Sequence, residues 1–359
     1  MVSRPLRVGI VGVGNIAERH AQGYLEIPSL AVIRATADIL PAVAQAKAEA
    51  WRAPRWFGSL DEMLEADIDA VDICLPHDLH VDAVCRVAQA GKHIYIEKPL
   101  ARTGAECVEI IRAVEDAGVC LMVGHNLLFN PVVAQARALV EAGAVGQVFM
   151  VRGASYGWPP IRAGSYRLSR ERCGGGVLAD TGVHVLYMMR ALAGEARAVS
   201  ASLARAVRKE IGGEDNALLH LEYENGALGE MVASYSTKLS TWELGFPEGW
   251  DQRLEAYGDR GTLLVDVAHG ALSLFSADDD RRLEPADWRT GTRRIHGASV
   301  FQLPNVYFDS FKFAVRGFVE AVLGDRHPPV TATDGYRVVQ LVDAAYESAR
   351  TGSQVTLKA

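Results

Sequence analysis

The sequence lacks any hydrophobic run long enough to span a membrane, and cysteines are few among its 359 residues. The cysteine count is odd, and no two cysteines have the Cys-x-x-Cys spacing of a thiolate zinc site. The five are Cys74, Cys85, Cys107, Cys120 and Cys173. This pattern is typical of reduced thiols, so we expect neither a disulfide framework nor a metal site. Residues 1–7 contain no signal-peptide h-region, and we predict a cytoplasmic protein that does not bind membranes.

An excess of basic residues is also missing. The 37 Lys and Arg residues face 44 Asp and Glu residues, which gives a net charge of -7. A nucleic-acid-binding protein needs a basic surface to neutralise phosphates, so the composition argues against a nucleic-acid partner. The apolar share of 49% and the charged share of 23% are typical of a folded globular protein. The chain is longer than one hydrophobic core usually serves, which predicts two domains.

The first 125 residues alternate short apolar runs with longer amphipathic stretches. The predicted strands are residues 6–11, 30–37, 70–75, 93–96 and 119–123. The predicted helices between them are residues 17–25, 41–51, 81–90 and 104–117. Strands that alternate with helices indicate a parallel sheet with helices on both faces. We therefore predict a doubly wound α/β domain over residues 1–126.

The pattern changes after residue 130, where one helix is followed by a cluster of strand-like runs. The predicted strands are residues 148–154, 199–203, 217–223, 227–235, 253–257, 262–267 and 271–275. Turn sequences at residues 224–226 and 259–261 suit hairpins between neighbouring strands. Residues 276–297 have the least structured composition, and two helices follow at 311–323 and 336–351. We predict a second, α+β domain over residues 127–359 with a mostly antiparallel sheet.

Glycine is the residue type in which the sequence is rich, with 34 residues. The stretch Gly12-Val13-Gly14-Asn15-Ile16-Ala17 has G-x-G-x-x-A spacing and lies between a predicted strand and a predicted helix. Gly12 would allow a tight turn, and Gly14 would let the backbone approach a pyrophosphate. The helix that begins near Asn15 and Ile16 would direct its N-terminus at the phosphate charge. The stretch therefore predicts a dinucleotide site, and a plain glycine-rich turn is the alternative.

Asp38 follows the second predicted strand, where a carboxylate would bind the ribose hydroxyls of a dinucleotide. The same carboxylate would repel a 2′-phosphate, and the next residue, Ile39, carries no positive charge. We therefore expect NAD rather than NADP as the cofactor. A helix N-cap before Pro41 is the alternative, and the two roles are compatible.

Polar residues follow the later strands of the predicted parallel sheet. They are Pro76, His80, Glu97, Lys98 and Asn126. Ligands of open parallel sheets bind at the carboxyl ends of the strands, so these residues are expected to line the cofactor site. Lys98 in a surface ion pair is the alternative. Glu97 is expected to support the Lys98 loop. His80 is expected to begin a helix or to support the residues that contact the ligand.

Six motifs, in order along nearly the whole chain, match those of one oxidoreductase family. They are Gly12–Ala17, Pro76-x-x-x-His80, Glu97-Lys98-Pro99, Phe129-Asn130-Pro131, Gly174–His184 and Ser348–Gly352. The sequence resembles the Gfo/Idh/MocA family, which includes glucose-fructose oxidoreductase and inositol dehydrogenase. The resemblance implies a Rossmann domain, an α+β domain with a large open sheet, and NAD-dependent oxidation of a secondary hydroxyl of a sugar, sugar acid or cyclitol. Because relatives pair this sheet between copies, it also implies a homodimer or homotetramer.

The resemblance further implies that Lys98, Asp180 and His184 form the catalytic set. Asp180 and His184 stand four residues apart, so in a helix they would share one face. A neutral histidine is well matched to the proton of a hydroxyl, so His184 is the expected general acid/base. Lys98 would orient the reacting oxygen, and Asp180 the substrate hydroxyl or the imidazole. An ion pair on a helix surface is the alternative for Asp180 and His184, and Tyr187 stands where many relatives have Asp.

The residues expected to contact a substrate are aromatic or cationic and lie in the predicted second domain. They are Tyr156, Trp158, Arg162, Tyr166, Arg167 and Lys238. Aromatic faces stack on sugar rings, and a guanidinium binds a carboxylate or phosphate. Tryptophans that close loops or line a subunit interface, and a solvated basic loop, are the alternatives. Two other functions stay open: an enzyme that keeps NAD bound while it cycles oxidation and reduction, and a non-catalytic sugar or dinucleotide sensor.

Overall fold

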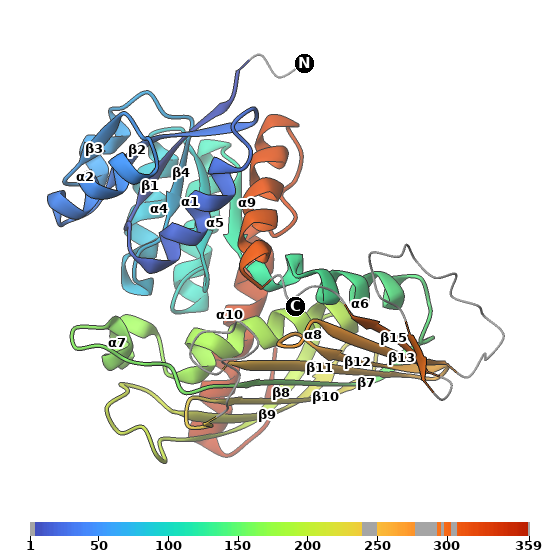
Figure 1. Ribbon diagram of the computed structural model, residues 1–359. Helices are drawn as coiled ribbons and strands as arrows, with labels where there is room; N and C mark the ends of the chain where they lie inside the picture. Colours follow the sequence, from blue (N-terminus) through green and yellow to red (C-terminus); the bar gives the residue numbers. More distant parts are fainter. Residues whose placement is uncertain (1–3, 239–249, 277–292, 296–297, 303–306, 358–359) are drawn as a thin grey trace. The chain divides into compact units, whose positions relative to one another are not determined.

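The computed structural model describes the chain except residues 1–3, 239–249, 277–292, 296–297, 303–306 and 358–359 (Figure 1). The chain divides into two compact units. The first unit consists of Met1–Asn126 and Phe308–Val339, and the second of Leu127–Tyr307 and Gln340–Ala359. Each unit has a sheet of its own.

The first unit contains a six-stranded sheet in which every neighbouring pair of strands is parallel. Its strands are β1 (Leu6–Val11), β2 (Ala31–Ala37), β3 (Arg55–Phe57), β4 (Ala70–Ile73), β5 (His93–Glu97) and β6 (Leu121–Gly124). Their order is β3-β2-β1-β4-β5-β6, so the winding direction reverses between β1 and β4. In such sheets, the crevice at the carboxyl ends of the strands beside this reversal binds ligands. The predicted parallel, doubly wound fold is confirmed.

Local sequence signals begin and end the helices of this unit. The helices are α1 (Asn15–Leu25), α2 (Pro41–Ala50), α3 (Leu60–Leu64), α4 (His80–Gln89), α5 (Gly104–Ala117) and α9 (Tyr307–Leu323). Thr103 caps α5 by accepting a hydrogen bond from the backbone N–H of Glu106, and Gly118 ends it with a φ of +62°. Pro41 occupies the first turn of α2, where its missing N–H is not needed.

Helix α9 joins the first unit although it follows the large sheet of the second unit in the sequence. Phe311 and Phe318 on α9 are buried, and their rings contact His20 and Tyr95 respectively. Gly23 on α1 permits this packing, because a Cβ there would lie 2.9 Å from Val315. The structure thus groups Phe308–Val339 with the first unit, whereas the sequence placed all of 127–359 in the second domain. An amphipathic pattern indicates that a helix has a buried face but not which sheet covers it.

The second unit contains a ten-stranded sheet within the described residues. Its strands are β7 (Val148–Tyr156), β8 (Ala196–Ala204), β9 (Asn216–Tyr223), β10 (Leu228–Ser234), β11 (Asp251–Gly258), β12 (Gly261–Asp266), β13 (Ala271–Ser276), β14 (Arg293–Ile295), β15 (Ala298–Gln302) and β16 (Val355–Thr356). Their order is β14-β15-β13-β12-β11-β7-β10-β9-β8-β16, and only the β7–β10 pair of these described strands is parallel. The predicted mostly antiparallel sheet is confirmed.

Helices cover one face of this sheet. The helical segments are α6 (Pro131–Glu141), α7 (Arg170–Cys173), a π-helical turn (Leu178–Gly182), α8 (Val183–Ala193) and α10 (Ala332–Thr351). Helix α8 packs on β7 and β11, and α6 packs on β12 and β13 (Figure 1). Gly153 on β7 brings α8 close, because a Cβ there would lie 2.4 Å from Val185. The hairpin predicted at residues 224–226 forms, and Gly226 has a φ of +85°.

Two short elements, β3 and α3, were not predicted from the sequence, because each is too short to show a periodic pattern. The polar segment at residues 276–297 lies largely outside the described residues. In the part of the chain that the structure describes, no helix combines the length and the apolar character that crossing a membrane requires.

Candidate active site

The glycine turn after β1 leaves the N-terminus of α1 open. Gly12 has a φ of +79°, and a Cβ there would lie 2.6 Å from the carbonyl oxygen of Cys74. At Gly14, an added Cβ would meet no atom within 4 Å. No side chain caps α1, so the first N–H groups at Asn15 and Ile16 have no side-chain acceptor at the N-cap. This arrangement fits a pyrophosphate group, which would accept these hydrogen bonds and face the positive end of the helix dipole.

Asp38 lies immediately after β2 and holds the glycine turn. Its Oδ2 accepts a hydrogen bond from the backbone N–H of Val13 at 3.1 Å, and its Oδ1 accepts one from Leu40 at 3.0 Å. The N-cap residue of α2 is Leu40, so Asp38 does not cap that helix as the alternative interpretation required. The structure therefore brings Asp38 and the glycine turn together. The side chain of the adjacent Ile39 is exposed and supplies no charge.

The His80 ring contacts backbone carbonyl groups of two loops. Its Nε2 lies 3.0 Å from the carbonyl oxygen of Leu75, and its Nδ1 lies 3.0 Å from that of Pro99. The ring is fully buried, and this burial lowers the pKa of His80. The loop that it holds begins at Pro76. The contacts indicate that His80 positions the backbone that follows β4 and β5, which agrees with the expectation of a supporting role.

Glu97 and Lys98 stand where β5 ends. The carboxylate of Glu97 is buried, and its Oε2 accepts a hydrogen bond from the backbone N–H of Lys98 at 3.2 Å. The Lys98 side chain is half-buried. Beyond the end of the next strand, β6, Asn126 is buried and donates to Ser310 Oγ on α9 at 2.8 Å. Glu97 and Asn126 thus support the carboxyl edge of the sheet through bonds to their own unit.

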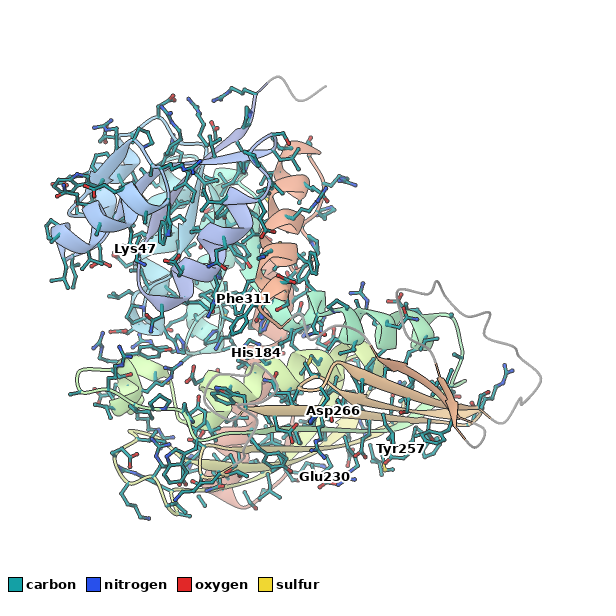
Figure 2. All side chains as sticks on the ribbon, in the orientation of Figure 1. Lys47, His184, Glu230, Tyr257, Asp266 and Phe311 are labelled. Carbon is teal, nitrogen blue, oxygen red and sulfur yellow. The ribbon has the colours of Figure 1, made fainter. Side chains whose placement is uncertain are left out.

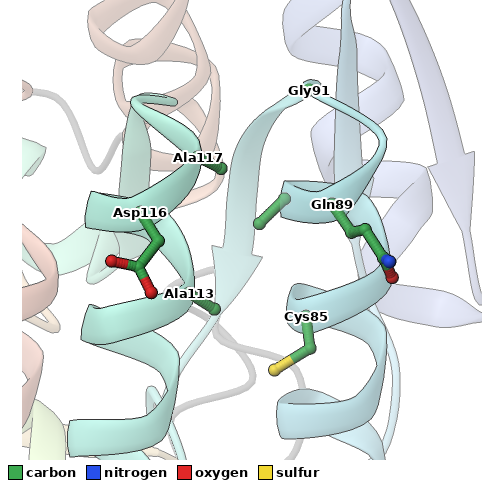
Figure 3. A pocket seen from close by; sticks show the side chains of 7 residues that line it. Cys85, Gln89, Gly91, Ala113, Asp116 and Ala117 are labelled. Atoms are coloured by element: carbon green, nitrogen blue, oxygen red, sulfur yellow. The ribbon is translucent and has the colours of Figure 1, made fainter.

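A groove of about 470 Å³ lies between α4 and α5, away from this edge (Figure 3). Its lining residues are Cys85, Ala88, Gln89, Gly91, Ala113, Asp116 and Ala117. These residues occupy the C-terminal ends of the two helices, which lead into the starts of β5 and β6. The groove therefore lies at the end of the sheet opposite the cofactor edge, and it carries none of the candidate site residues.

The glycine run Gly174–Gly176, which precedes the π-helical turn, packs against the backbone at Gly213 and Glu214. Gly174 has a φ of +82°, and a Cβ at Gly176 would lie 2.0 Å from the carbonyl oxygen of Glu214. The buried carboxylate of Glu214 accepts hydrogen bonds from the backbone N–H groups of Gly176 and Leu178 and from Tyr346 Oη. Burial raises the pKa of Glu214. These contacts hold the start of the helical segment that carries Asp180 and His184.

Asp180 lies in the π-helical turn, and its carboxylate is held by two donors. Arg167 Nε and Tyr235 Oη both donate to Asp180 Oδ2. Tyr235 Oη is also 2.6 Å from Thr181 Oγ1. Burial, reinforced by the Asp180 charge, raises the pKa of Tyr235 well above its usual value, so the phenol keeps its proton. Asp180 is 1% exposed, and the interpretation as an exposed ion pair on a helix surface is therefore wrong.

His184 is the second residue of α8, which packs on one face of the large sheet (Figure 2), and its side chain is buried. The segment from Leu178 to Ala193 is helical throughout, which meets the condition under which Asp180 and His184 were expected to share a face. Asp180 and His184 belong to the second unit, and Lys98 belongs to the first. Tyr187, one turn beyond His184, is buried, and Arg190 lies over its ring at 5.8 Å.

The residues expected to contact a substrate have different surroundings. Trp158 is half-buried, with Arg208 at 4.6 Å and Lys238 at 4.8 Å from its ring centre. Arg167 contacts Asp180 and lies over the ring of Tyr166 at 5.3 Å. Arg162 is exposed. These residues remain candidates.

Tyr156 lies elsewhere. Strand alternation gives it the same side of β7 as Arg152, which pairs with Glu230 and Glu255 on the face away from α8. Tyr156, which was expected to contact a substrate, is therefore a residue of that open face.

Several side chains that hold the candidate site were not predicted from the sequence. Tyr235 and Glu214 support Asp180 and the start of its helix, and His20 and Asp72 contact each other behind Glu97. A signal for Asp72 is present in the sequence, because a charged residue interrupts the apolar strand from Ala70 to Ile73. No comparable signal marks Tyr235, which reads as an ordinary strand residue.

Comparison with known proteins matches two segments of the chain to two family models. A model of the oxidoreductase family with an NAD-binding Rossmann fold matches residues 6–125, and a model of the GFO/IDH/MocA C-terminal domain matches residues 133–264. Levoglucosan dehydrogenase from Pseudarthrobacter phenanthrenivorans is 28% identical over 388 residues, covering 98% of this chain and 97% of that protein. Myo-inositol 2-dehydrogenase from Thermotoga maritima is 28% identical over 359 residues, covering 98% and 99%.

Solved structures are similar over the same extent. Levoglucosan dehydrogenase in complex with NADH has a TM-score of 0.87 and 26% identity, covering 99% of this chain and 100% of that chain. Another structure of levoglucosan dehydrogenase contains NADH and levoglucosan, with a TM-score of 0.85 and the same 26% identity. The matches extend through both units and include the glycine turn and the segment with Asp180 and His184. The chain belongs to the Gfo/Idh/MocA family of oxidoreductases.

Proposed function

We propose that the protein is an NAD-dependent dehydrogenase that acts on a secondary hydroxyl of a sugar, sugar acid or cyclitol. The observation that carries this proposal is the buried carboxylate of Asp180, held by Tyr235 and Arg167 four residues before His184. Keeping a carboxylate buried requires such donors, and a protein that only binds a sugar has no need for an acid/base pair. Named relatives that act on levoglucosan and inositols support a polyol substrate.

The first unit would hold the cofactor. Gly12, Gly14 and the N-terminus of α1 would bind the pyrophosphate, and Asp38 would bind the ribose hydroxyls. Structural relatives that contain NADH or NAD support this assignment. The negative charge of Asp38 favours NAD over NADP, because it would repel a 2′-phosphate. When bound, NAD supplies the acceptor for a hydride.

The proposed chemistry needs one proton acceptor and two orienting groups. Oxidation removes a hydride from the carbon and a proton from its hydroxyl, and we assign the proton to the imidazole of His184. Lys98 would donate a hydrogen bond to the reacting oxygen and so stabilise the negative charge that develops there. Asp180 would orient the substrate hydroxyl or the imidazole. Reduction of a ketone uses the same groups in the reverse order.

The substrate would lie among residues of the second unit. Trp158 and Tyr166 offer aromatic surface for the apolar face of a sugar ring, and Arg162, Arg167 and Lys238 offer positive charge. This combination supports polyols and sugar acids as the substrates to test.

The test is the appearance of NADH absorbance with a panel of sugars, sugar acids and cyclitols. We expect turnover with at least one of them, and we expect His184→Ala and Lys98→Ala to lower kcat by about 100-fold or more. His269→Ala is the matched control, because this exposed histidine in the turn after β12 pairs with Asp266 and belongs to none of the candidate site residues.

Two results would count against the proposal. A complete lack of turnover, with sugar binding that survives His184→Ala, would identify a sensor instead of an enzyme. Wild-type kcat in Lys98→Ala would leave the reaction standing but would refute the role of Lys98.

We also propose that the protein forms a homodimer or homotetramer through the open face of the large sheet. Strand alternation places Leu218, Leu228, Leu264 and Phe275 on this face, and each is between 38% and 53% exposed. Glu230 and Tyr257 lie on the same face, away from His184 (Figure 2). Exposed apolar side chains among a few paired charges are typical of an interface. Light scattering should show an oligomer that Leu228→Glu dissociates, and a monomeric wild type would refute this proposal.

A further inference from the structure

Two residues of a buried charged cluster in the first unit, His20 and Asp72, have no role in the proposed function. His20 on α1 and Asp72 on β4 are both 0% exposed, and Glu97 at the end of β5 is 7% exposed. Ionisable groups are rarely buried this completely unless they are paired. The three residues come from three different elements and meet at one point. Packing alone does not explain why a core position in β4 carries a carboxylate.

Both nitrogens of the His20 ring face carboxylate oxygens. Nδ1 lies 3.0 Å and 3.1 Å from the two oxygens of Asp72, and Nε2 lies 3.1 Å from Glu97 Oε1. A neutral imidazole has one N–H and one lone pair, so one of its nitrogens would repel its carboxylate. Only the imidazolium form donates a hydrogen bond from both nitrogens. The rings of Tyr95 and Phe311 lie 5.1 Å and 5.9 Å from the His20 ring and also suit a cation.

The cluster extends to the backbone of Lys98. Glu97 binds His20 through Oε1, and its other oxygen, Oε2, accepts the hydrogen bond from the Lys98 N–H. A continuous path therefore runs from Asp72 through His20 and Glu97 to the peptide of Lys98.

We propose that His20 is a positioning residue, whose imidazolium fixes the Glu97 carboxylate and thereby the backbone at Lys98. The importance of Lys98 for turnover rests on the proposed function, but the network itself does not. His20 lies on the helix whose N-terminus is expected to bind the pyrophosphate. The same residue thus connects the cofactor helix to the end of β5.

The charges around His20 keep it protonated. The groups that contact it are Asp72 from β4, Cys74 directly after β4, Tyr95 and Glu97 from β5, and Phe311 from α9; Tyr24 lies one turn further along its own helix. Burial acts to lower the pKa of His20, but the interactions with Asp72 and Cys74 together outweigh burial, and the pKa is raised well above its usual value. Burial raises the pKa values of Tyr24, Tyr95 and Cys74, so these groups stay neutral.

A metal ion is the competing explanation for the cluster. The ligand atoms of His20, Asp72 and Cys74 all lie within 4.8 Å of one another, and Cys74 Sγ is 3.3 Å from His20 Nδ1. The contacts between His20 and Asp72 have ordinary hydrogen-bond lengths, and a proton satisfies them without an ion. Metal analysis of the purified protein separates the two explanations. Zinc bound at about one ion per chain, and lost in Cys74→Ala, would overturn the proposal.

Nuclear magnetic resonance of the full-length, histidine-labelled protein tests the charge directly. The His20 signals are identified by their loss in His20→Gln. We expect both ring nitrogens to carry protons at about pH 8, where an ordinary histidine is neutral. In Asp72→Asn, which keeps the shape of the side chain but removes its charge, we expect the titration of His20 to move down toward the ordinary range. A neutral His20 in the wild type at this pH would overturn the proposal.

Hydrogen exchange at the Lys98 amide tests the positioning role without any substrate. His20→Gln is expected to raise the exchange rate of this amide about tenfold, because Glu97 loses the donor that holds it. His93→Gln is the matched control, since it makes the same substitution at the opposite end of β5, where the His93 ring accepts a hydrogen bond from the backbone N–H of Cys120. If His20→Gln fails to fold, the Lys98 amide exchange rate of Asp72→Asn is measured at one pH below and one pH above the lowered pKa of His20. Faster exchange than in the wild type is then expected only at the higher pH, where His20 is neutral. Wild-type protection of Lys98 with His20 neutral would refute the positioning role.

Kinetics connect the network to turnover once a substrate is known. His20→Gln is expected to lower kcat about tenfold, while the KM for NAD changes by less than about twofold, because the defect lies at the reacting oxygen. A variant with increased Lys98 exchange and unchanged kcat would refute the link to catalysis. If no compound in the panel is turned over, the proposed function fails, and the resonance and exchange results still decide whether the network exists.

Discussion

Replacing the two glycines of the turn after β1, one at a time, should separate stability from cofactor binding. Gly12 has a φ of +79°, and a Cβ there would lie 2.6 Å from a backbone oxygen of Cys74. Gly14 has a φ of -77°, and a Cβ there would meet nothing within 4 Å. Gly12→Ala therefore introduces two steric conflicts into the protein without cofactor, and Gly14→Ala introduces none.

The free energies follow from these positions. A left-handed backbone costs alanine about 1–2 kcal/mol, and the collision with the carbonyl adds about 1–3 kcal/mol. We expect Gly12→Ala to lower the free energy of unfolding by about 2–4 kcal/mol. Gly14→Ala restricts the unfolded chain without straining the folded one, so we expect it to raise that free energy by about 0.4–1 kcal/mol. The two variants thus change stability in opposite directions.

Cofactor affinity should follow a different order. The methyl group of Gly14→Ala would stand where the backbone approaches the pyrophosphate, and we expect NAD to bind at least tenfold more weakly, about 1.4 kcal/mol. Urea unfolding of the protein without cofactor gives the stabilities, and titration calorimetry with NAD gives the affinities. A folded Gly14→Ala protein with wild-type affinity would refute the phosphate-binding role of this turn. A Gly12→Ala protein as stable as the wild type would refute the steric argument.

Three further predictions concern single carboxylates or their partners. Asp38→Asn removes the charge that would repel a 2′-phosphate, and we expect the ratio of kcat/KM with NADP to that with NAD to rise about tenfold; an unchanged ratio contradicts this assignment. Tyr235→Phe removes a donor to buried Asp180, and initial rates and urea unfolding should show a kcat about tenfold lower and an unfolding free energy about 1–2 kcal/mol lower; wild-type kcat would exclude this role. Burial acts to raise the pKa of Asp69, but hydrogen bonds from Arg7 lower it to about 2, so its stabilising effect is present at neutral pH and is lost as the pH falls from about 4 to about 2. Urea unfolding of Asp69→Asn should show a loss of about 1 kcal/mol at neutral pH that disappears in acid, and an equal loss at both pH values would contradict the linkage.

Segments with a strong local pattern were predicted almost to the residue. The strand predicted at 6–11 is β1, and the helix predicted at 104–117 is α5, which Thr103 and Gly118 delimit. These elements carry their own signals, because an apolar run specifies a buried strand and a cap specifies a helix end. Strand β3 carries no such signal: it has three residues, and two of them are exposed. Its position depends on pairing with β2, which the local sequence does not encode.

Helix α9 shows a second limit of local patterns. Its apolar residues predict a helix with one buried face, and the helix forms. The identity of the surface that it covers depends on shape, in particular on Gly23, which lets α9 approach α1. The domain boundary could therefore not be obtained from the periodicity of residues 308–339. A glycine within a helix is a weak clue to such close packing, since it also has ordinary explanations.

In the candidate site, too, local motifs could be predicted from the sequence, whereas contacts between distant residues could not. Short motifs identify the groups expected to perform chemistry: Asp180 and His184 stand four residues apart, and Lys98 follows Glu97 directly. The residues that hold these groups come from far along the chain, since Tyr235 is 55 residues from Asp180 and His20 is 77 residues from Glu97. A motif records the spacing that chemistry requires, whereas the support needs only a donor at the right point in space, which many strands or helices could supply. Differences in charge and geometry between members of a family with the same motifs are therefore to be sought first at these supporting positions, and Asp72 and Tyr235 are the positions at which this chain tests that idea.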